Sequence, residues 1–218
     1  MNPPVILFQD QRFVVLDKPA GLPVHPGSAG GSSVEDWFPL LSRRRDGPWL
    51  AHRLDTDTAG CLAIALRKTP LIEAQTAFAQ GRVAKTYWAV VRGGPAEPAG
   101  TLDAPLLRRD ANRQWRMIVD PAGLPAITEW RVMGTGADAQ GPLSWLELRP
   151  KTGRTHQIRA HCAHLGCPIL GDPHYGGRNA GEGRLHLLAR AIAIPLDPPV
   201  AAVAEPPAHM RSALALCA

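Results

Sequence analysis

The sequence predicts an α+β protein with a mixed, largely antiparallel central sheet flanked by helices and loops. Short strand-like segments and segments with helical spacing follow one another along the chain, but they lack the regular strand–helix–strand order of a parallel α/β fold. The chain has 218 residues, of which 45% are apolar and 20% are charged, and these values are ordinary for a globular protein with a large core. We therefore expect a single domain over residues 1–218.

The chain opens with two short apolar segments, which we expect to be strands at residues 5–8 and 13–16 joined by a polar turn. Residues 18–27 contain too many prolines and glycines for regular structure. A serine at position 32 or 33 is suited to cap a helix, because apolar residues recur at helical spacing after it up to Leu41.

The next hundred residues alternate between strand and helix signals. Residues 50–55 are expected to form a strand that runs into a loop, and residues 61–66 a buried strand. Residues 69–80 predict an amphipathic helix that stops at Gly81. Residues 84–91 alternate in polarity as a strand does.

The second half gives a weaker pattern at first and a clear helix later. We expect strands at residues 115–119, 127–133 and 143–148, with an exposed loop at residues 135–141. Residues 155–165 predict a helix capped near Thr152 or Thr155 and stopped by Gly166. A last short helix is expected at residues 208–216.

Several classes of protein are excluded by composition. No apolar run approaches the roughly 20 residues that a membrane-spanning helix needs, and the N-terminus lacks the basic start and apolar core of a signal peptide. We therefore expect a cytoplasmic protein with no membrane partner. The cysteines should then be reduced thiols and not a disulfide framework. They are Cys61, Cys162, Cys167 and Cys217.

The positive charge is concentrated in one segment. From Arg149 to Arg190, seven lysines and arginines face two acidic residues, so this segment has a net charge of +5, equal to that of the whole chain. The basic residues are Arg149, Lys151, Arg154, Arg159, Arg178, Arg184 and Arg190, and the acidic ones are Asp172 and Glu182. Such a concentration suits a polyanion-binding surface, although a solvated face without a ligand is the alternative.

Two dense stretches carry the chemistry. The first is His52-Arg53-Leu54-Asp55-Thr56-Asp57-Thr58-Ala59-Gly60, and the second is Gly153-Arg154-Thr155-His156-Gln157-Ile158-Arg159. A single carboxylate at a turn suits a nucleophile or base, and a cation from the second stretch would hold that carboxylate ionised.

Together and in this order, the two stretches resemble those of the RluA-type pseudouridine synthases. Three further segments are also similar to motifs of that family: Lys85-Thr86-Tyr87-Trp88-Ala89-Val90-Val91-Arg92-Gly93, Leu165-Gly166-Cys167-Pro168-Ile169-Leu170-Gly171-Asp172-Pro173-His174-Tyr175-Gly176, and Arg184-Leu185-His186. Lys18-Pro19-Ala20-Gly21 matches the family's first motif, which gives structural support near the site. The resemblance runs from about residue 8 to about residue 195. One departure is Ala59, where the family usually has a serine.

The resemblance implies an isomerase that converts uridine to pseudouridine in structured RNA, either ribosomal or transfer RNA, after flipping the base out of its stack. It implies a single pseudouridine synthase catalytic domain over residues 1–218, without the separate N-terminal RNA-binding domain that many relatives have. It also implies a monomer, RNA as the partner, and no cofactor or metal. Asp55 would be the catalytic carboxylate, as nucleophile or base, with Arg159 as its ion-pair partner and Tyr87 as the stacking platform. The substrate-binding residues would be His52, Arg53, Arg154 and Ile158.

Other interpretations of the same residues remain open. Asp55 could simply anchor a turn, Arg154 competes with Arg159 as the cation, and Asp55 with Asp57 could be a glycosidase pair. A zinc site is a weak alternative, and its ligands would be His161, Cys162, His164, Cys167 and His174. A non-catalytic RNA-binding protein of the same fold is the main alternative to the enzyme.

Overall fold

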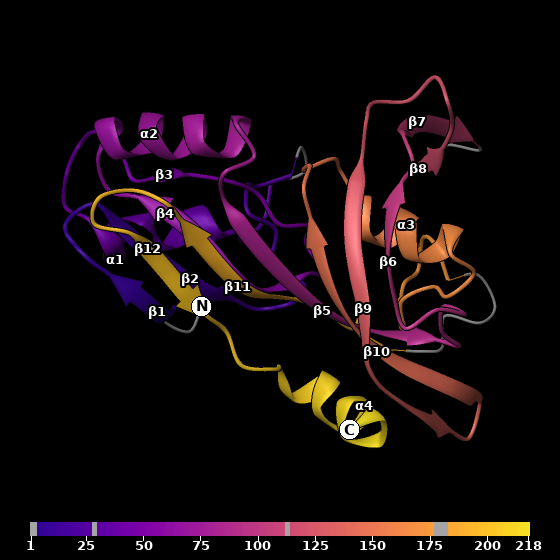
Figure 1. Cartoon of the computed structure of the whole chain (residues 1–218). Coiled ribbons are helices and arrows are strands. Elements are labelled where there is room, and N and C mark those ends of the chain that lie inside the picture. Colours follow the sequence, from indigo (N-terminus) through magenta and orange to yellow (C-terminus); the bar gives the residue numbers. More distant parts are fainter. Residues whose placement is uncertain (1–3, 28–29, 112–113, 177–182) are drawn as a thin grey trace. The chain divides into compact units, whose positions relative to one another are not determined.

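The computed structural model describes residues 4–27, 30–111, 114–176 and 183–218. The chain divides into two compact units (Figure 1). Unit 1 comprises Met1–Lys85 and Leu188–Pro206, and unit 2 comprises Thr86–Leu187 and Pro207–Ala218. The single catalytic domain stays a prediction.

Unit 1 is built on strands in the order β1-β2-β4-β11. These are β1 (Val5–Gln9), β2 (Phe13–Lys18), β4 (Ala59–Ala65) and β11 (Leu187–Ile194), and β3 (Trp49–Leu50) and β12 (Val200–Val203) pair with β4 and β11. β4 and β11 run parallel, whereas the other pairs are antiparallel. All seven residues of β4 are buried, as its continuous apolar sequence predicts.

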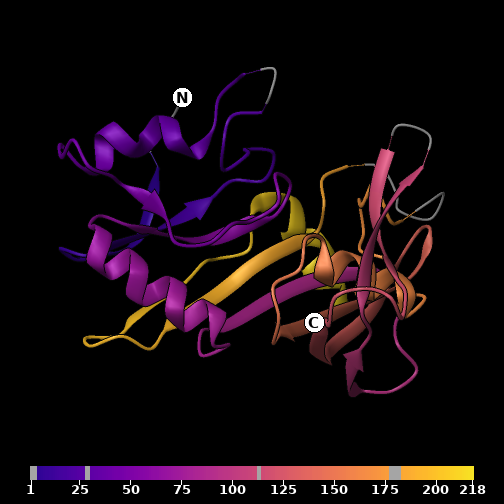
Figure 2. The same cartoon turned by 90° about the horizontal axis from the view of Figure 1, so that it is seen from above.

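The helices of unit 1 begin where the sequence signals predict. Ser33 is the N-cap of the 3₁₀ helix η1 (Val34–Trp37), and its N–H donates to the Asp36 carboxylate at 3.1 Å. The short helix α1 (Phe38–Leu41) follows. α2 (Lys68–Ala79) contacts β3 and β4 and is the longer of the two purple helices in Figure 2.

Unit 2 holds an antiparallel sheet in the order β5-β10-β9-β6. Its strands are β5 (Ala84–Arg92), β10 (Gly141–Pro150), β9 (Ile127–Asp138) and β6 (Ala99–Asp103). β7 (Leu106–Ala111) and β8 (Gln114–Val119) form a separate antiparallel hairpin. α3 (Gln157–His164) contacts β8 and β10, and α4 (Ala208–Cys217) contacts β9 and β10.

These observations confirm the predicted α+β class with a mixed, mostly antiparallel sheet. The core of unit 2 lies between its sheet and α3, where Leu146 and Leu148 of β10 pack with Ile158 and Cys162. No helix in the described ranges is long and apolar enough to cross a membrane.

Two local predictions are wrong. Residues 135–141 are not an exposed loop, because β9 and β10 continue into a tight hairpin. The Asp138 carboxylate stabilises this turn by accepting from the Gln140 N–H at 2.9 Å and from both terminal nitrogens of Arg92. Arg92 holds the pKa of Asp138 down at about 2, and Gly141 takes a positive φ of 127°.

The second error concerns the segment before Asp55. Only Trp49–Leu50 is a strand, so Asp55 lies in a turn that precedes β4 and not at the end of a strand. The β6, β7, β11 and β12 strands are not predicted by the sequence analysis. β6, β7 and β12 are short, with five, six and four residues. β11 pairs in parallel with β4, which lies far earlier in the chain, so no local pattern contains that pairing.

Candidate active site

The turn that carries Asp55 is held mainly through its backbone. The Thr58 N–H donates to the Asp55 carbonyl at 3.1 Å, and the Gly21 N–H donates to the Thr56 carbonyl at 2.9 Å. Asp55 itself is half-buried. These contacts fix the backbone at Asp55 and at the residue after it, and a positioned nucleophile or base requires such a fixed backbone.

Gly60 brings the start of β4 against β11. It pairs with Ala189, its φ is +106°, and a Cβ at this position would clash with the Ala189 carbonyl oxygen. No other residue type fits both the backbone conformation and the space. The glycine therefore sets where the turn after Asp55 enters the sheet.

Lys18 is a fully buried ammonium beneath this turn. Its Nζ donates to the carbonyl oxygens of Pro19, Leu22 and Thr56 at 2.9, 2.8 and 2.8 Å. Burial lowers the pKa of Lys18 to about 8, while the charges of Asp57 and Asp55 oppose that shift. The sequence analysis placed Lys18 in a motif that supports the site. In the structure, its ammonium group joins two backbone segments, residues 19–22 and the turn at Thr56.

His52 contacts the backbone of β4. Its Nε2 accepts from the Ala63 N–H at 3.0 Å, and its ring lies 5.1 Å from that of Phe78. Burial lowers the pKa of His52 to about 4, so the ring is neutral near pH 7 and keeps its acceptor. Its predicted contact with the substrate stays a prediction, as does that of Arg53, whose side chain is exposed.

Tyr87 and Ile158 meet at the same core in unit 2. Tyr87 lies on β5 opposite Leu148 and is partly buried against the core that contains Ile158, which is 6% exposed. A half-buried ring beside an aliphatic wall is a suitable surface for a flat base. The predicted roles of both residues in base contact stay predictions.

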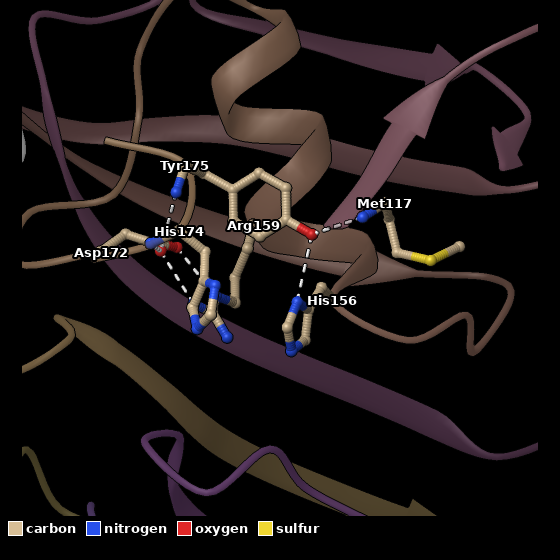
Figure 3. A network of polar contacts seen from close by, with 6 residues as sticks. All are labelled: Met117, His156, Arg159, Asp172, His174 and Tyr175. Carbon is tan, nitrogen blue, oxygen red and sulfur yellow. Dashed lines mark hydrogen bonds and ion pairs between the residues drawn. The ribbon is translucent and has the colours of Figure 1, made fainter. Parts of the chain in front are cut away.

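Arg159 makes a buried, bidentate ion pair with Asp172 (Figure 3). Its Nε and one terminal nitrogen each donate to a different oxygen of Asp172 at 2.8 Å, and the two residues are 2% and 0% exposed. The whole side chain of Arg159 is enclosed. The sequence analysis missed Asp172 as a partner of Arg159, although a carboxylate in a Gly-Asp-Pro turn was a usable signal.

Asp172 has further partners that fix its orientation. It accepts from the backbone N–H groups of His174 and Tyr175 at 2.9 and 3.1 Å. Burial alone would raise the pKa of Asp172, but Arg159 and the backbone donors together lower it, so the carboxylate is ionised. The position of the arginine is thus set by a charged group that is itself fixed.

Tyr175 covers the other side of the guanidinium. The Arg159 Cζ lies 5.3 Å from the centre of the Tyr175 ring, within the range of a cation–π contact. The Tyr175 hydroxyl accepts from the Met117 N–H at 2.9 Å and lies 3.1 Å from His156 Nδ1 (Figure 3). We call Arg159, Asp172, Tyr175, His156 and Met117 the arginine network.

The start of α3 differs from the predicted cap. His156 is the N-cap and has a left-handed backbone, with φ 50° and ψ 20°. Thr152 instead donates to the side chain of Gln157 at 2.7 Å and accepts from the Ile127 N–H. The left-handed backbone of His156 turns its ring toward Tyr175. The strained conformation therefore positions a residue of the arginine network as well as beginning the helix.

Arg154 is exposed and lies outside the arginine network. Its Nε donates to the Pro125 carbonyl at 3.0 Å. Asp55 belongs to unit 1 and Arg159 to unit 2, so their pairing stays a prediction, as does the choice of Arg159 over Arg154.

The predicted basic segment is less uniform in the structure than in the sequence. Arg159 is buried, and Arg149 and Lys151 form ion pairs with Glu147 and Glu129 at 2.8 Å each. Arg178 and Glu182 lie outside the described residues. The segment therefore presents fewer uncompensated charges than its composition suggests.

The residues of the alternative zinc site have other tasks. His161 is buried between the Thr128 hydroxyl and the Ala104 carbonyl, at 2.9 and 3.0 Å. Burial raises the pKa of Cys167 to about 11 and that of Cys162 further, so both are buried thiols. Within the described residues, no group of three or more His, Cys, Asp or Glu side chains is placed to hold a metal ion.

Comparison with known proteins gives one consistent result. The family model described as RNA pseudouridylate synthase matches residues 12–164. The chain belongs to the RNA pseudouridylate synthase family. It is of the RluA type and is an RNA pseudouridine synthase, an isomerase that acts on RNA.

Individual relatives agree with this assignment. The chain is 38% identical over 193 residues to an uncharacterized RNA pseudouridine synthase of Zymomonas mobilis, covering 87% of this chain and 86% of the relative. It is 36% identical over 198 residues to ribosomal large subunit pseudouridine synthase D of Haemophilus influenzae, covering 84% and 57%. The solved structure of human RNA pseudouridylate synthase domain containing 4 superposes with a TM-score of 0.80 at 28% identity, covering 97% and 92%.

Proposed function

We propose that this pseudouridine synthase modifies uridine in ribosomal RNA and that Asp55 is its catalytic carboxylate. The observation that carries the proposal is the turn around Asp55, which is pinned by backbone hydrogen bonds and by buried Lys18 while the carboxylate stays half-exposed. The choice of ribosomal RNA is supported by relatives named as ribosomal large subunit pseudouridine synthases. Transfer RNA is the alternative substrate.

The reaction conserves all atoms and changes no oxidation state overall. The N1–C1′ bond of uridine breaks, the freed uracil turns, and a C5–C1′ bond forms. The proton on C5 is lost, and N1 carries a proton in the product. Because no electron acceptor or donor is needed, we propose an enzyme without a cofactor or metal, in which Asp55 either attacks C1′ or abstracts a neighbouring sugar proton.

The other site residues are proposed to bind and orient the target. Arg159 pairs with Asp55 and keeps it ionised, Tyr87 stacks on the uracil, and Ile158 walls the pocket. Arg53 fills the space left by the flipped base or holds its phosphate, which suits an exposed guanidinium. Arg154 and His52 are proposed as further substrate contacts, and the protein as a cytoplasmic monomer.

The test compares wild type, Asp55→Asn and Asp57→Asn on an unmodified transcript of large-subunit ribosomal RNA, with pseudouridine mapped at nucleotide resolution. Asp57 is the matched control, since it lies in the same turn and is also half-buried. We expect Asp55→Asn to lose at least about 10³-fold in turnover while binding RNA, and Asp57→Asn to stay within about 10-fold of wild type.

Three results would contradict the proposal in different ways. Substantial turnover by Asp55→Asn would remove the catalytic assignment. Modification of transfer RNA but not ribosomal RNA would correct the substrate. Binding of RNA by wild type without any new pseudouridine would favour the non-catalytic RNA-binding protein.

A further inference from the structure

Trp115 of β8 stacks on His156, the N-cap residue of α3. The ring centres are 4.8 Å apart and the ring planes differ by only 22°, so the two rings lie nearly face to face. The Trp115 ring also lies 5.1 Å from the guanidinium carbon of Arg108, within the range of a cation–π contact. The indole is half-buried, and these contacts restrict how its ring can turn.

His156 has an unfavourable backbone conformation. Its φ is 50°, and it is the only non-glycine residue with a positive φ among the residues that the structure describes. Glycine or asparagine would adopt this backbone at a lower cost in free energy. A strained histidine persists only where the surrounding contacts compensate for the strain. The conformation therefore indicates that the imidazole has a task at this position.

The imidazole connects Trp115 to Tyr175. His156 Nδ1 lies 3.1 Å from the Tyr175 hydroxyl, and the two rings are nearly perpendicular, with an angle of 81° between their planes (Figure 3). The Tyr175 ring in turn lies 5.3 Å from Cζ of Arg159. A continuous series of side-chain contacts thus runs from the half-buried indole to the buried guanidinium.

The last contact of this series restrains a motion that the ion pair leaves soft. The bidentate pair with Asp172 fixes the Arg159 guanidinium within its own plane, through Nε and one terminal nitrogen. Tilting out of that plane stretches both hydrogen bonds only slightly. The Tyr175 ring opposes such a tilt, because it lies against the guanidinium.

We infer that Trp115 is a positioning residue for the Arg159 guanidinium, acting through His156 and Tyr175. Trp115 holds the imidazole in its strained conformation, the imidazole holds the Tyr175 hydroxyl, and the Tyr175 ring restrains the guanidinium. The inference rests on the proposed function, in which Arg159 keeps the catalytic carboxylate ionised. It adds a residue that supports turnover through protein contacts alone.

The first test measures kcat and KM of Trp115→Leu and Trp115→Phe on a large-subunit ribosomal RNA transcript. Trp115→Leu removes the aromatic face, and we expect kcat to fall about 5–10-fold while KM stays within about 2-fold. Trp115→Phe keeps an aromatic face for His156, and its kcat should stay within about 2-fold of wild type. The matched control is Arg108→Ala, which removes the exposed cation beside Trp115 and should also change kcat by less than about 2-fold.

A double-mutant cycle tests whether Trp115 acts through Tyr175. In the Tyr175→Leu background the series of contacts is already broken, so Trp115→Leu should lower kcat by less than about a further 2-fold. Effects of the two changes that multiply in full would overturn the inference. A rise in KM that exceeds the fall in kcat would also overturn it, because Trp115 would then contact the RNA directly. Equal losses in Trp115→Phe and Trp115→Leu would overturn it as well.

Thermal unfolding separates positioning from a role in folding alone. His156→Asn removes the imidazole but suits the left-handed backbone, so its melting temperature should stay within a few degrees of wild type while kcat falls about 5–10-fold. A melting temperature many degrees lower with unchanged kcat would overturn the inference. Substantial turnover by Asp55→Asn would instead count against the proposed function. An inactive Asp55→Asn together with fully multiplicative Trp115 and Tyr175 effects would overturn this inference and leave the proposed function intact.

Discussion

The turn of Asp55 and the arginine network hold their charged groups in opposite ways. Asp55 is half-exposed on a turn whose fixed points are backbone carbonyls and N–H groups, gathered by one buried lysine. Arg159 is 2% exposed and is fixed by two side chains, the bidentate carboxylate of Asp172 and the aromatic face of Tyr175. The Tyr175 hydroxyl in turn contacts Met117 and His156. A group that must react with substrate needs access, whereas a group that sets the electrostatics of a site gains from low dielectric and fixed partners.

The comparison predicts that breaking the arginine network is the more damaging change to the fold. Asp172→Ala leaves the Arg159 guanidinium buried without its counter-charge and also removes the acceptor of two backbone N–H groups. We expect a loss of about 3–5 kcal/mol in the free energy of unfolding, measured by urea denaturation. Turnover should fall as well, because Arg159 loses its position.

The control for this change is Asp110→Ala, which removes the carboxylate of an exposed ion pair with Arg108. Its cost should stay below about 1 kcal/mol. A loss of less than about 1 kcal/mol for Asp172→Ala would mean that the buried pair does not determine the position of Arg159.

Lys18 allows the corresponding test of the Asp55 turn. The quantity to measure is the free energy of unfolding as a function of pH. The pKa of Lys18 is about 8 in the folded protein and rises to its ordinary value of 10.5 on unfolding. Between these values the unfolded chain holds a proton that the folded chain has released, so raising the pH stabilises the folded state. Below pH 8 the lysine is charged in both states, and its burial cost is present in full.

We therefore expect the stability of wild type relative to Lys18→Met to increase from pH 7.5 to pH 10, by up to about 3 kcal/mol. Paired urea titrations at the two pH values measure this difference. Lys68→Met, at the exposed start of α2, is the control and should show no such trend. A wild-type advantage that shrinks with rising pH would reverse the sign and show that the pKa of Lys18 is not lowered.

His52 sharpens the comparison, because it lies three residues from Asp55 but is held as a structural acceptor. His52→Ala leaves the Ala63 N–H without its partner and should lower the free energy of unfolding by about 1–3 kcal/mol. If His52 also contacts substrate, as predicted, KM will rise in addition. Arg53→Ala should instead act mainly on KM, which we expect to rise. Its free energy of unfolding should change by less than about 0.5 kcal/mol, because the Arg53 side chain is exposed.

The two regions also differ in how far the sequence predicts them. The helices over residues 68–79 and 208–217 and the buried strand at 59–65 follow from local periodicity and stop signals, and the structure confirms them within one or two residues. The pairing of Arg159 with Asp172 is not predicted, because it depends on a loop that returns to the helix from 13 residues further along the chain.

Long-range contacts also explain why the predictions for residues 135–141 and for the start of α3 are wrong. The turn at residues 139–140 is fixed by Asp138 and by Arg92 from a different strand, which no local pattern contains. The N-cap at His156 has a left-handed backbone that only tertiary contacts support. Motif resemblance identified the candidate residues, but the manner in which each is held comes from long-range contacts.

Replacing Tyr175 should have a small and specific effect. Tyr175→Phe keeps the ring over Arg159 but removes the hydroxyl that accepts from the Met117 N–H and contacts His156. We expect a loss of about 1 kcal/mol in the free energy of unfolding and a fall in kcat of about 3–10-fold. Tyr175→Leu should cost more on both measures, because it also removes the aromatic face, about 0.5–2 kcal/mol in its own right.

Comparing the kcat values of Tyr175→Phe and Tyr175→Leu shows whether the ring or the hydroxyl of Tyr175 positions Arg159. If Tyr175→Phe equals wild type in kcat while Tyr175→Leu does not, the ring alone positions the guanidinium and the link to β8 is dispensable. If Tyr175→Phe already accounts for the whole loss, the hydroxyl and its bond to β8 position Arg159. The second result is the one expected here, because the Met117 N–H on β8 is one of the two groups that hold the Tyr175 hydroxyl in place.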